Sequence, residues 1–81
     1  MKTALTPTAV KSYLAAPAPV RRAFVKQTAL LVRNLRHPSL RAKKYDETND
    51  IWQARINRDW RFYFTIDGDT YTIHKIIPHP R

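Results

Sequence analysis

The stretch from Ile51 to His79 constrains the fold of this chain most strongly. Three runs rich in β-branched and aromatic residues follow one another there, separated by Asn57-Arg58-Asp59 and by Asp67-Gly68-Asp69. Apolar and polar residues alternate with the period of a β-strand, and an Asp-Gly pair supplies the positive φ that a tight hairpin needs. The stretch therefore predicts a three-stranded antiparallel meander.

The two faces of the first two predicted strands differ in chemistry. One face is apolar and aromatic, and we expect it to form the core: Trp52, Ala54, Ile56, Trp60, Phe62, Phe64 and Ile66. The other face carries Gln53, Arg55, Arg61, Tyr63 and Thr65. Two arginines and an aromatic hydroxyl on an open sheet face are where we expect function.

The core face of the third predicted strand stays undecided from the sequence. It is either Tyr71, Ile73 and Ile77, or His74 and Ile76, because Lys75 interrupts the first set. Met1 to Leu5 is likewise either an edge strand or a frayed end.

Two helices are predicted before the meander. Thr6 is the expected N-cap and Pro7 the first helical residue, and an apolar stripe of Val10, Tyr13 and Leu14 leads to an end at Ala15-Ala16-Pro17. A longer helix is expected from Pro19 to about Leu35, where apolar residues recur every three or four positions. The prediction is one α+β domain over residues 1–81, an N-terminal αα-hairpin packed on one face of a small twisted antiparallel β-sheet.

Charge is the most informative bulk property. The net charge is +9, residues 1 to 44 hold ten Lys or Arg and no acid, and all six acids lie between Asp46 and Asp69. Such an excess favours a polyanion or an acidic protein as partner, and the alternative is a basic surface that is only solvated. Arg33 and Arg36 either complement the dipole of the second helix or take a direct functional role. Arg41, Lys43 and Lys44 form an extended basic segment that is either solvated or placed to hold phosphates.

Composition excludes several classes of site. The chain has no cysteine, and its three scattered histidines predict no zinc or other metal site. One glycine cannot form a nucleotide-binding glycine loop, so no cofactor is expected. The absence of a long apolar run or a signal-peptide pattern predicts no membrane association and favours the cytoplasm. Chemistry must then run on Arg, Lys, His and Tyr, which are the side chains suited to binding and cleaving a phosphodiester.

A set of short motifs resembles the RelE/ParE superfamily of bacterial type II toxins, and in particular its RelE-like and HigB-like messenger-RNA interferases. The motifs are His37-Pro38-Ser39-Leu40-Arg41, Lys43-Lys44, Ile51-Trp52-Gln53-Ala54-Arg55-Ile56-Asn57, Asp59-Trp60-Arg61 and Pro78-His79. The resemblance covers roughly residues 5 to 79, and it implies the fold predicted above.

The resemblance also implies an activity. Such a toxin is a metal-independent endoribonuclease that cuts messenger RNA on the ribosome, by attack of the 2′-hydroxyl on the adjacent phosphate. By position, Arg55 and Arg61 would stabilise the phosphate and His79 would be the acid or base. Arg41, Lys43, Lys44 and Arg81 would contact the RNA backbone. An acidic antitoxin is the implied partner, and the toxin would be a monomer or part of a toxin–antitoxin hetero-oligomer.

Two other functions remain open. Gln53 stands where some members have a second basic residue, and ParE-type gyrase poisons share the fold without ribonuclease chemistry, so a non-nuclease toxin or an antitoxin-binding module is the alternative. A general nucleic-acid-binding domain is the third possibility, but the sequence predicts no exposed aromatic platform. Arg61 also has a structural alternative, an ion pair with Asp59 or Asp50.

Overall fold

The predicted meander is present in the computed structural model, which describes residues 1–79. Its strands are β3 (Ile51–Arg55), β4 (Trp60–Asp67) and β5 (Thr70–Pro78), joined by antiparallel hairpins. Gly68 has φ +61° in the turn before β5, a value that glycine adopts without steric cost. The turn between β3 and β4 is held by the Asn57 side chain, which accepts hydrogen bonds from the backbone N–H groups of Asp59 and Trp60.

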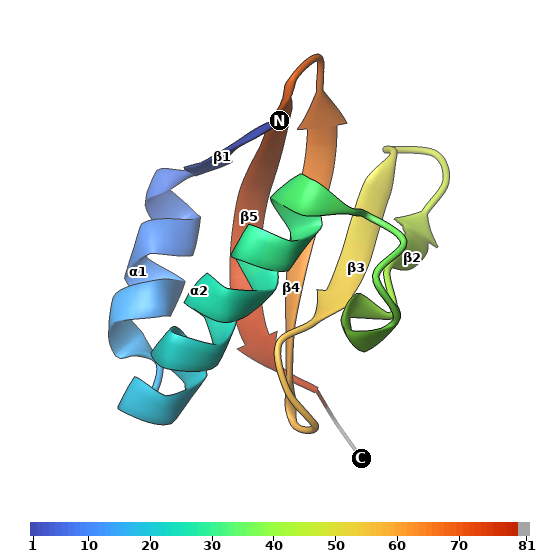
Figure 1. Ribbon diagram of the computed structural model, residues 1–81. Coiled ribbons are helices and arrows are strands. Elements are labelled where there is room, and N and C mark those ends of the chain that lie inside the picture. Colours follow the sequence, from blue (N-terminus) through green and yellow to red (C-terminus); the bar gives the residue numbers. More distant parts are fainter. Residues whose placement is uncertain (80–81) are drawn as a thin grey trace.

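Two further strands complete a five-stranded sheet with the order β1-β5-β4-β3-β2 (Figure 1). β2 (Lys43–Asp46) pairs antiparallel with β3, and β1 (Lys2–Leu5) pairs parallel with β5. The first five residues therefore supply an edge strand, one of the two alternatives left by the sequence. Because β1 runs parallel, the sheet is mixed, whereas the sequence predicted an antiparallel one.

Both helices lie on the same face of the sheet (Figure 1), as predicted. α1 (Pro7–Ala15) begins as expected, because the Thr6 side chain accepts a hydrogen bond from the Ala9 N–H at 3.1 Å and Pro7 occupies the first helical position. α2 (Ala18–Arg33) starts one residue before the predicted Pro19 and ends two residues before Leu35. A single 3₁₀ turn, η1 (Pro38–Leu40), then leads to β2.

The predicted apolar stripe of α1 is wrong in its phase. Val10 and Leu14 are 42% and 68% exposed, whereas Ala9 is fully buried against the sheet. Tyr13 is half-buried and its ring lies 5.7 Å from that of Phe24. A small residue at the contact lets the helix approach β5 closely, so the larger apolar side chains turn outward.

The core lies between the helices and the predicted apolar face of the meander. Phe62 and Phe64 are fully buried, Trp52 and Trp60 pack partly buried against them, and Ile66 near the β4–β5 turn stays exposed. From α2, the buried residues are Val20, Phe24, Gln27 and Leu31, at the spacing of one helix face.

A β-bulge at His74 resolves the undecided face of β5. Lys75 pairs with Tyr63 while Ile73 pairs with Phe64, so His74 is an extra residue on β5. One extra residue exchanges the two faces of a strand, and Tyr71, Ile73 and Ile76 therefore all point to the core. Each of the two alternatives was correct on one side of the bulge.

Candidate nucleic-acid interface

The sheet face turned away from the helices carries the predicted polar residues in two rows. In the first row Arg55 pairs with Arg61, which pairs with Ile77 on β5. In the second row Gln53 lies between Lys43 and Tyr63, and Tyr63 pairs with Lys75. The face is open only in part, since Gln53 and Tyr63 are 8% and 6% exposed.

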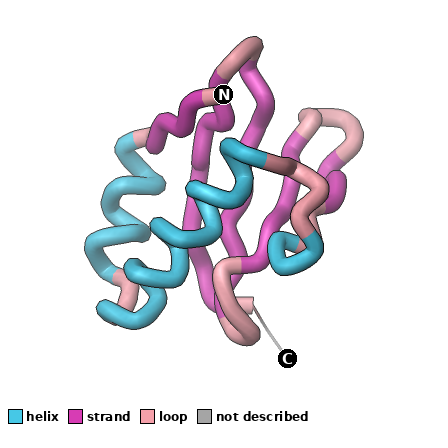
Figure 2. The backbone as a smooth tube through the Cα atoms, in the orientation of Figure 1, coloured by secondary structure: helices cyan, strands magenta, loops and turns pink. Residues whose placement is uncertain are grey.

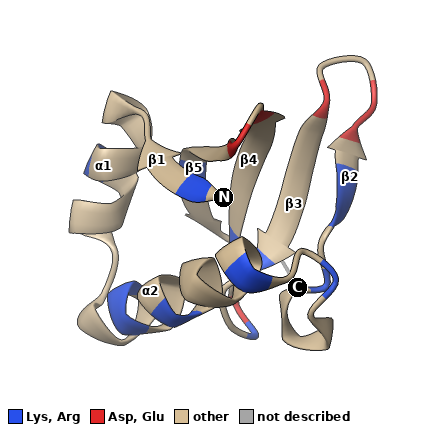
Figure 3. Cartoon of the chain, turned by 45° about the horizontal axis from the view of Figure 1, so that its top comes forward, with Lys and Arg blue, Asp and Glu red and all other residues tan. Residues whose placement is uncertain are grey.

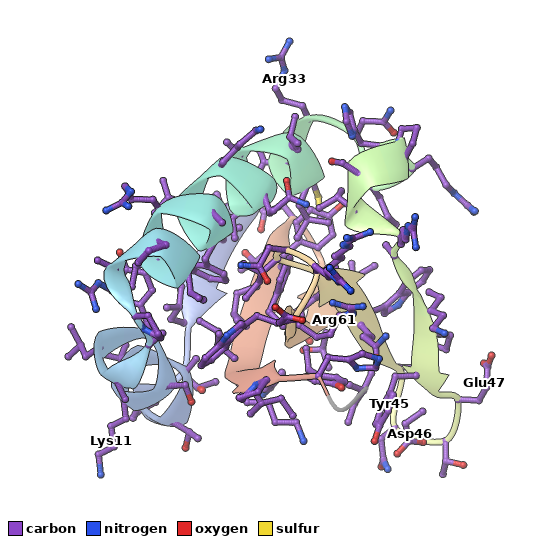
Figure 4. All side chains as sticks on the ribbon, turned by 90° about the horizontal axis from the view of Figure 1, so that it is seen from below. Lys11, Arg33, Tyr45, Asp46, Glu47 and Arg61 are labelled. Atoms are coloured by element: carbon purple, nitrogen blue, oxygen red, sulfur yellow. The ribbon has the colours of Figure 1, made fainter. Side chains whose placement is uncertain are left out.

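The Arg61 guanidinium is anchored at the β3–β4 hairpin. Its Nη1 donates hydrogen bonds to the carbonyl oxygens of Asn57 at 2.8 Å, Trp60 at 3.0 Å and Arg58 at 3.4 Å. These bonds hold one edge of the planar group at the end of the sheet (Figure 4). The Asp50 alternative is excluded, because the Asp50 carboxylate binds Lys44 at 3.0 Å.

Three arginines, Arg41, Arg55 and Arg61, form what we call the arginine cluster. Burial lowers the pKa of Arg61 most, the charges of Arg55 and Arg41 lower it further, and Tyr63 and Asp59 act in the opposite direction. Arg61 stays cationic at neutral pH, because a guanidinium is too basic to lose its proton there. The carboxylate whose charge acts on the cluster is that of Asp59, in the β3–β4 turn. Like charges held close together favour an anion between them.

His79 lies at the same end of the sheet as Arg61. Trp60 pairs with Pro78, and the backbone N–H of His79 donates to the Asp59 carbonyl at 2.6 Å, in the hairpin that anchors Arg61. The His79 side chain is exposed. The three residues predicted to be catalytic thus come from one end of the meander, and their role in catalysis stays a prediction.

The residues predicted to contact the RNA backbone separate into different surroundings. Arg41 is exposed, has a left-handed backbone with φ 46°, and belongs to the arginine cluster. Lys43 stands on the second row. Lys44 is directed to Asp50 and to the Trp52 ring, whose centroid is 5.2 Å from Nζ, so its ammonium is already engaged. Arg81 lies outside the described residues.

A buried glutamine of α2 fixes the position of this end of the sheet. Gln27 is 6% exposed, and its Nε2 donates to the carbonyl oxygens of Arg55 at 2.9 Å and Ser39 at 3.2 Å. It therefore ties α2 to the end of β3 and to η1, two residues before Arg41. The sequence reasoning did not single out Gln27, and nothing in the sequence indicates these two acceptors.

Sequence reasoning placed Tyr63 beside the two arginines but missed the side chains that contact it, among them Tyr45 and Lys75. The Tyr63 hydroxyl donates to Gln53 Oε1 at 3.1 Å, the Lys75 ammonium lies 4.8 Å from the centroid of the Tyr63 ring, and the Tyr45 ring lies edge-on to it at 4.9 Å. Burial raises the pKa of Tyr63, with a smaller contribution from Tyr45, so its hydroxyl stays protonated. The sequence signal for Lys75 was its interruption of the apolar pattern of the third strand, and no sequence signal pointed to Tyr45.

Charge is segregated along the strands. The antiparallel connections put the β2–β3 and β4–β5 turns at one end of the sheet and the β3–β4 turn at the other (Figure 2). Five of the six acids lie in or beside the first two turns, as the red segments of Figure 3 show: Asp46, Glu47, Asp50, Asp67 and Asp69. The arginine cluster and Arg58 are concentrated at the opposite end. The basic end is suited to an extended polyanion.

Other kinds of site find little support in the described part of the chain. No three His, Asp or Glu side chains among residues 1–79 are placed to hold a metal ion. No helix in that range is long and apolar enough to cross a membrane. Two surface hollows of about 340 and 350 Å³ are lined by residues of α1, α2 and the segment after α2, and not by the arginine cluster.

Comparison with known proteins relates the chain to solved structures by shape. No family model and no curated protein matches the sequence. A RelE–RelB complex from Pyrococcus horikoshii contains a similar chain at 20% identity and a TM-score of 0.80, covering 99% of this chain and 96% of that one. A YoeB/ParE toxin from Agrobacterium tumefaciens is similar at 15% identity and a TM-score of 0.81, covering 99% and 100%.

A third structure, the toxin–antitoxin complex RelBE2 from Mycobacterium tuberculosis, is similar at 21% identity and a TM-score of 0.78, with 96% of both chains covered. In all three comparisons the match extends over nearly the whole of both chains. The chain therefore adopts the fold of the RelE/ParE toxins.

Proposed function

We propose that this protein is the toxin of a type II toxin–antitoxin pair and cleaves messenger RNA. The observation that carries the proposal is the arginine cluster on the sheet face left open by the helices, with His79 at the same end. The likeness of fold to RelE and YoeB toxins supports it.

The proposed reaction uses side chains only. The ribose 2′-hydroxyl attacks the adjacent phosphorus, the bond to the 5′-oxygen breaks, and the products are a 2′,3′-cyclic phosphate and a 5′-hydroxyl. The phosphorane carries more negative charge than the phosphodiester, so Arg55 and Arg61 stabilise it more than the ground state. His79 moves a proton, either from the attacking hydroxyl or to the leaving oxygen.

The proposed partners follow from charge. A net charge of +9 suits messenger RNA on the ribosome, where the surroundings are rich in phosphate, and also an acidic antitoxin. Similar chains were solved in complexes of RelE with RelB and of YoeB with YefM. We propose an equivalent hetero-oligomer here, in the cytoplasm, with the antitoxin covering the basic end.

The test is induction of the protein in bacteria with mapping of RNA 5′ ends. Wild type should arrest growth and create new 5′-hydroxyl ends within messages. Arg55→Ala, Arg61→Ala and His79→Ala should each lose these ends. Arg33→Ala is the matched control, because this arginine of α2 points away from Arg61 (Figure 4).

A second candidate is a ParE-type toxin directed at gyrase, which the similarity to a YoeB/ParE toxin favours. Growth arrest with intact messages and cleaved DNA would identify it. If the protein causes no growth arrest and no RNA cleavage, it is a module that only binds its antitoxin.

A further inference from the structure

Tyr45 is presented at the edge of the sheet by a β-bulge. Lys44 pairs with Trp52 and Asp46 pairs with Ile51, so Tyr45 between them has no partner residue on β3. A bulge redirects the side chain of its extra residue. Here the Tyr45 side chain is 58% exposed and stands on the sheet face opposite the helices, beside Tyr63.

The ring has a rigid support. Its contact with Tyr63 is edge-to-face, with 4.9 Å between centroids and 72° between ring planes. Tyr63 itself is fixed by its hydrogen bond to Gln53 and by the Lys75 ammonium over its ring. An aromatic side chain that is held on one side and exposed on the other loses little entropy when a flat ligand stacks on it.

Cations lie on one side of this exposed ring, and the acidic β2–β3 turn with Asp46 and Glu47 lies on the other (Figure 4). Lys43 and Lys75 occupy the same row as Tyr63, and the Arg55–Arg61 pair lies two residues further along the same strands, about 7 Å away. A stacking surface beside a basic groove is the chemistry that binds single-stranded nucleic acid, because the bases stack while the phosphates contact the cations.

We propose that Tyr45 stacks on a nucleobase of single-stranded RNA whose phosphates contact the arginine cluster. The choice of RNA rests on the proposed function, whereas the stacking site rests on the geometry of the second row. Tyr45 contributes binding energy and no proton transfer.

The test measures affinity for short 2′-O-methyl RNA, which cannot be cleaved because its 2′-oxygen is blocked. Tyr45→Ala should weaken binding by about 5- to 150-fold, the range for loss of one stacked base, and Tyr45→Phe should bind like wild type. Leu14→Ala, which removes an exposed apolar side chain from α1, is the matched control and should also bind like wild type.

Abasic substitutions make the test specific. Removing the base at each position in turn should reveal one position at which wild type and Tyr45→Ala bind equally. Tyr45→Ala should leave the dependence of affinity on salt unchanged, because no phosphate contact is lost.

Two results would overturn the inference. If wild type binds RNA and Tyr45→Ala binds equally well, Tyr45 does not stack on a base, and the proposed function still stands. Tyr45 would then be a residue that contacts a protein partner. If wild type binds no RNA, the proposed function fails and the inference fails with it.

Discussion

At the scale of single residues, Arg61 combines two opposing effects. Its Nη1 bonds to three carbonyl oxygens stabilise the hairpin, while Arg41 and Arg55 repel its charge. A hydrogen bond to a charged group contributes about 1.5–3 kcal/mol, and close like charges offset part of that. We propose that this anchored guanidinium meets the phosphate of the RNA.

Arg61→Ala should therefore lower RNA cleavage far more than it lowers stability. We expect a 10²- to 10³-fold loss in cleavage rate, the effect of removing one preorganised donor to a developing oxyanion. The free energy of unfolding should fall by less than about 2 kcal/mol, because repulsion is relieved at the same time. Single-turnover cleavage and urea unfolding measure the two. Equal cleavage by variant and wild type would remove Arg61 from the mechanism.

The raised pKa of Tyr63 predicts how the stability of the protein depends on pH. Burial raises its pKa above the unfolded value of about 10, so between those two values the folded state binds more protons than the unfolded state. This contribution to stability is fully present below pH 10 and is lost as pH rises through the folded pKa.

Tyr63→Phe should be less stable than wild type at pH 7 by about 1 kcal/mol, because the bond to Gln53 is lost. That difference should shrink above pH 10, where only wild type has a hydroxyl to ionise on unfolding. Urea unfolding at pH 7 and at pH values above 10 measures it. A difference that stays constant with pH would contradict the assigned shift.

At the scale of elements, the alternation of β3 and β4 predicted both strands and their faces, because one face is buried and the register is set by short turns. The Thr6-Pro7 start of α1 followed from capping chemistry. The phase of α1 could not be predicted, since Ala9 is buried by close approach to β5 and not by hydrophobicity. The bulge at Tyr45 leaves no recognisable mark in a four-residue strand, and the bulge at His74 is marked only by the change of phase at Lys75, which the sequence alone did not assign to a bulge.

Gln27 connects three elements, and its replacement tests whether that connection positions the arginine cluster. Gln27→Leu keeps the size of the side chain but leaves the Arg55 and Ser39 carbonyls without this donor. We expect a loss of about 1–3 kcal/mol in unfolding free energy and slower RNA cleavage by folded protein. Lys26→Ala, the exposed neighbour on α2, is the control. If Gln27→Leu leaves stability and cleavage unchanged, the two hydrogen bonds of Gln27 do not position the arginine cluster.

At the scale of the whole molecule, the distribution of charge matters more than the net +9. The sequence showed that the acids are confined to residues 46–69, but not that five of them would gather at one end of the sheet. That arrangement depends on the order of the hairpins. The arginine pair was predictable from its place on one strand face. Arg41 joined it only because η1 returns the chain to the end of β3, where Gln27 holds it.

Two variants with the same net charge test whether RNA affinity depends on the charges at the basic end of the sheet or on the net charge of the whole molecule. Arg58→Gln removes one charge from the β3–β4 hairpin, and Arg33→Gln removes one from the end of α2. If RNA lies at the basic end, Arg58→Gln should reduce the slope of log affinity against log salt by about 1, and Arg33→Gln should not. Equal slopes for the two variants would mean that binding depends on net charge alone.

The central claim is that the arginine cluster promotes attack by a 2′-hydroxyl on messenger RNA. The most direct measurement uses ribosomes programmed with a message that carries a single 2′-deoxynucleotide at the mapped cleavage position. We predict that the unmodified message yields a 2′,3′-cyclic phosphate and a 5′-hydroxyl with wild type and Arg33→Ala, and stays intact with Arg61→Ala. The 2′-deoxy message should stay intact with every variant. Cleavage of the 2′-deoxy message, or no cleavage of either message by wild type, would contradict the claim.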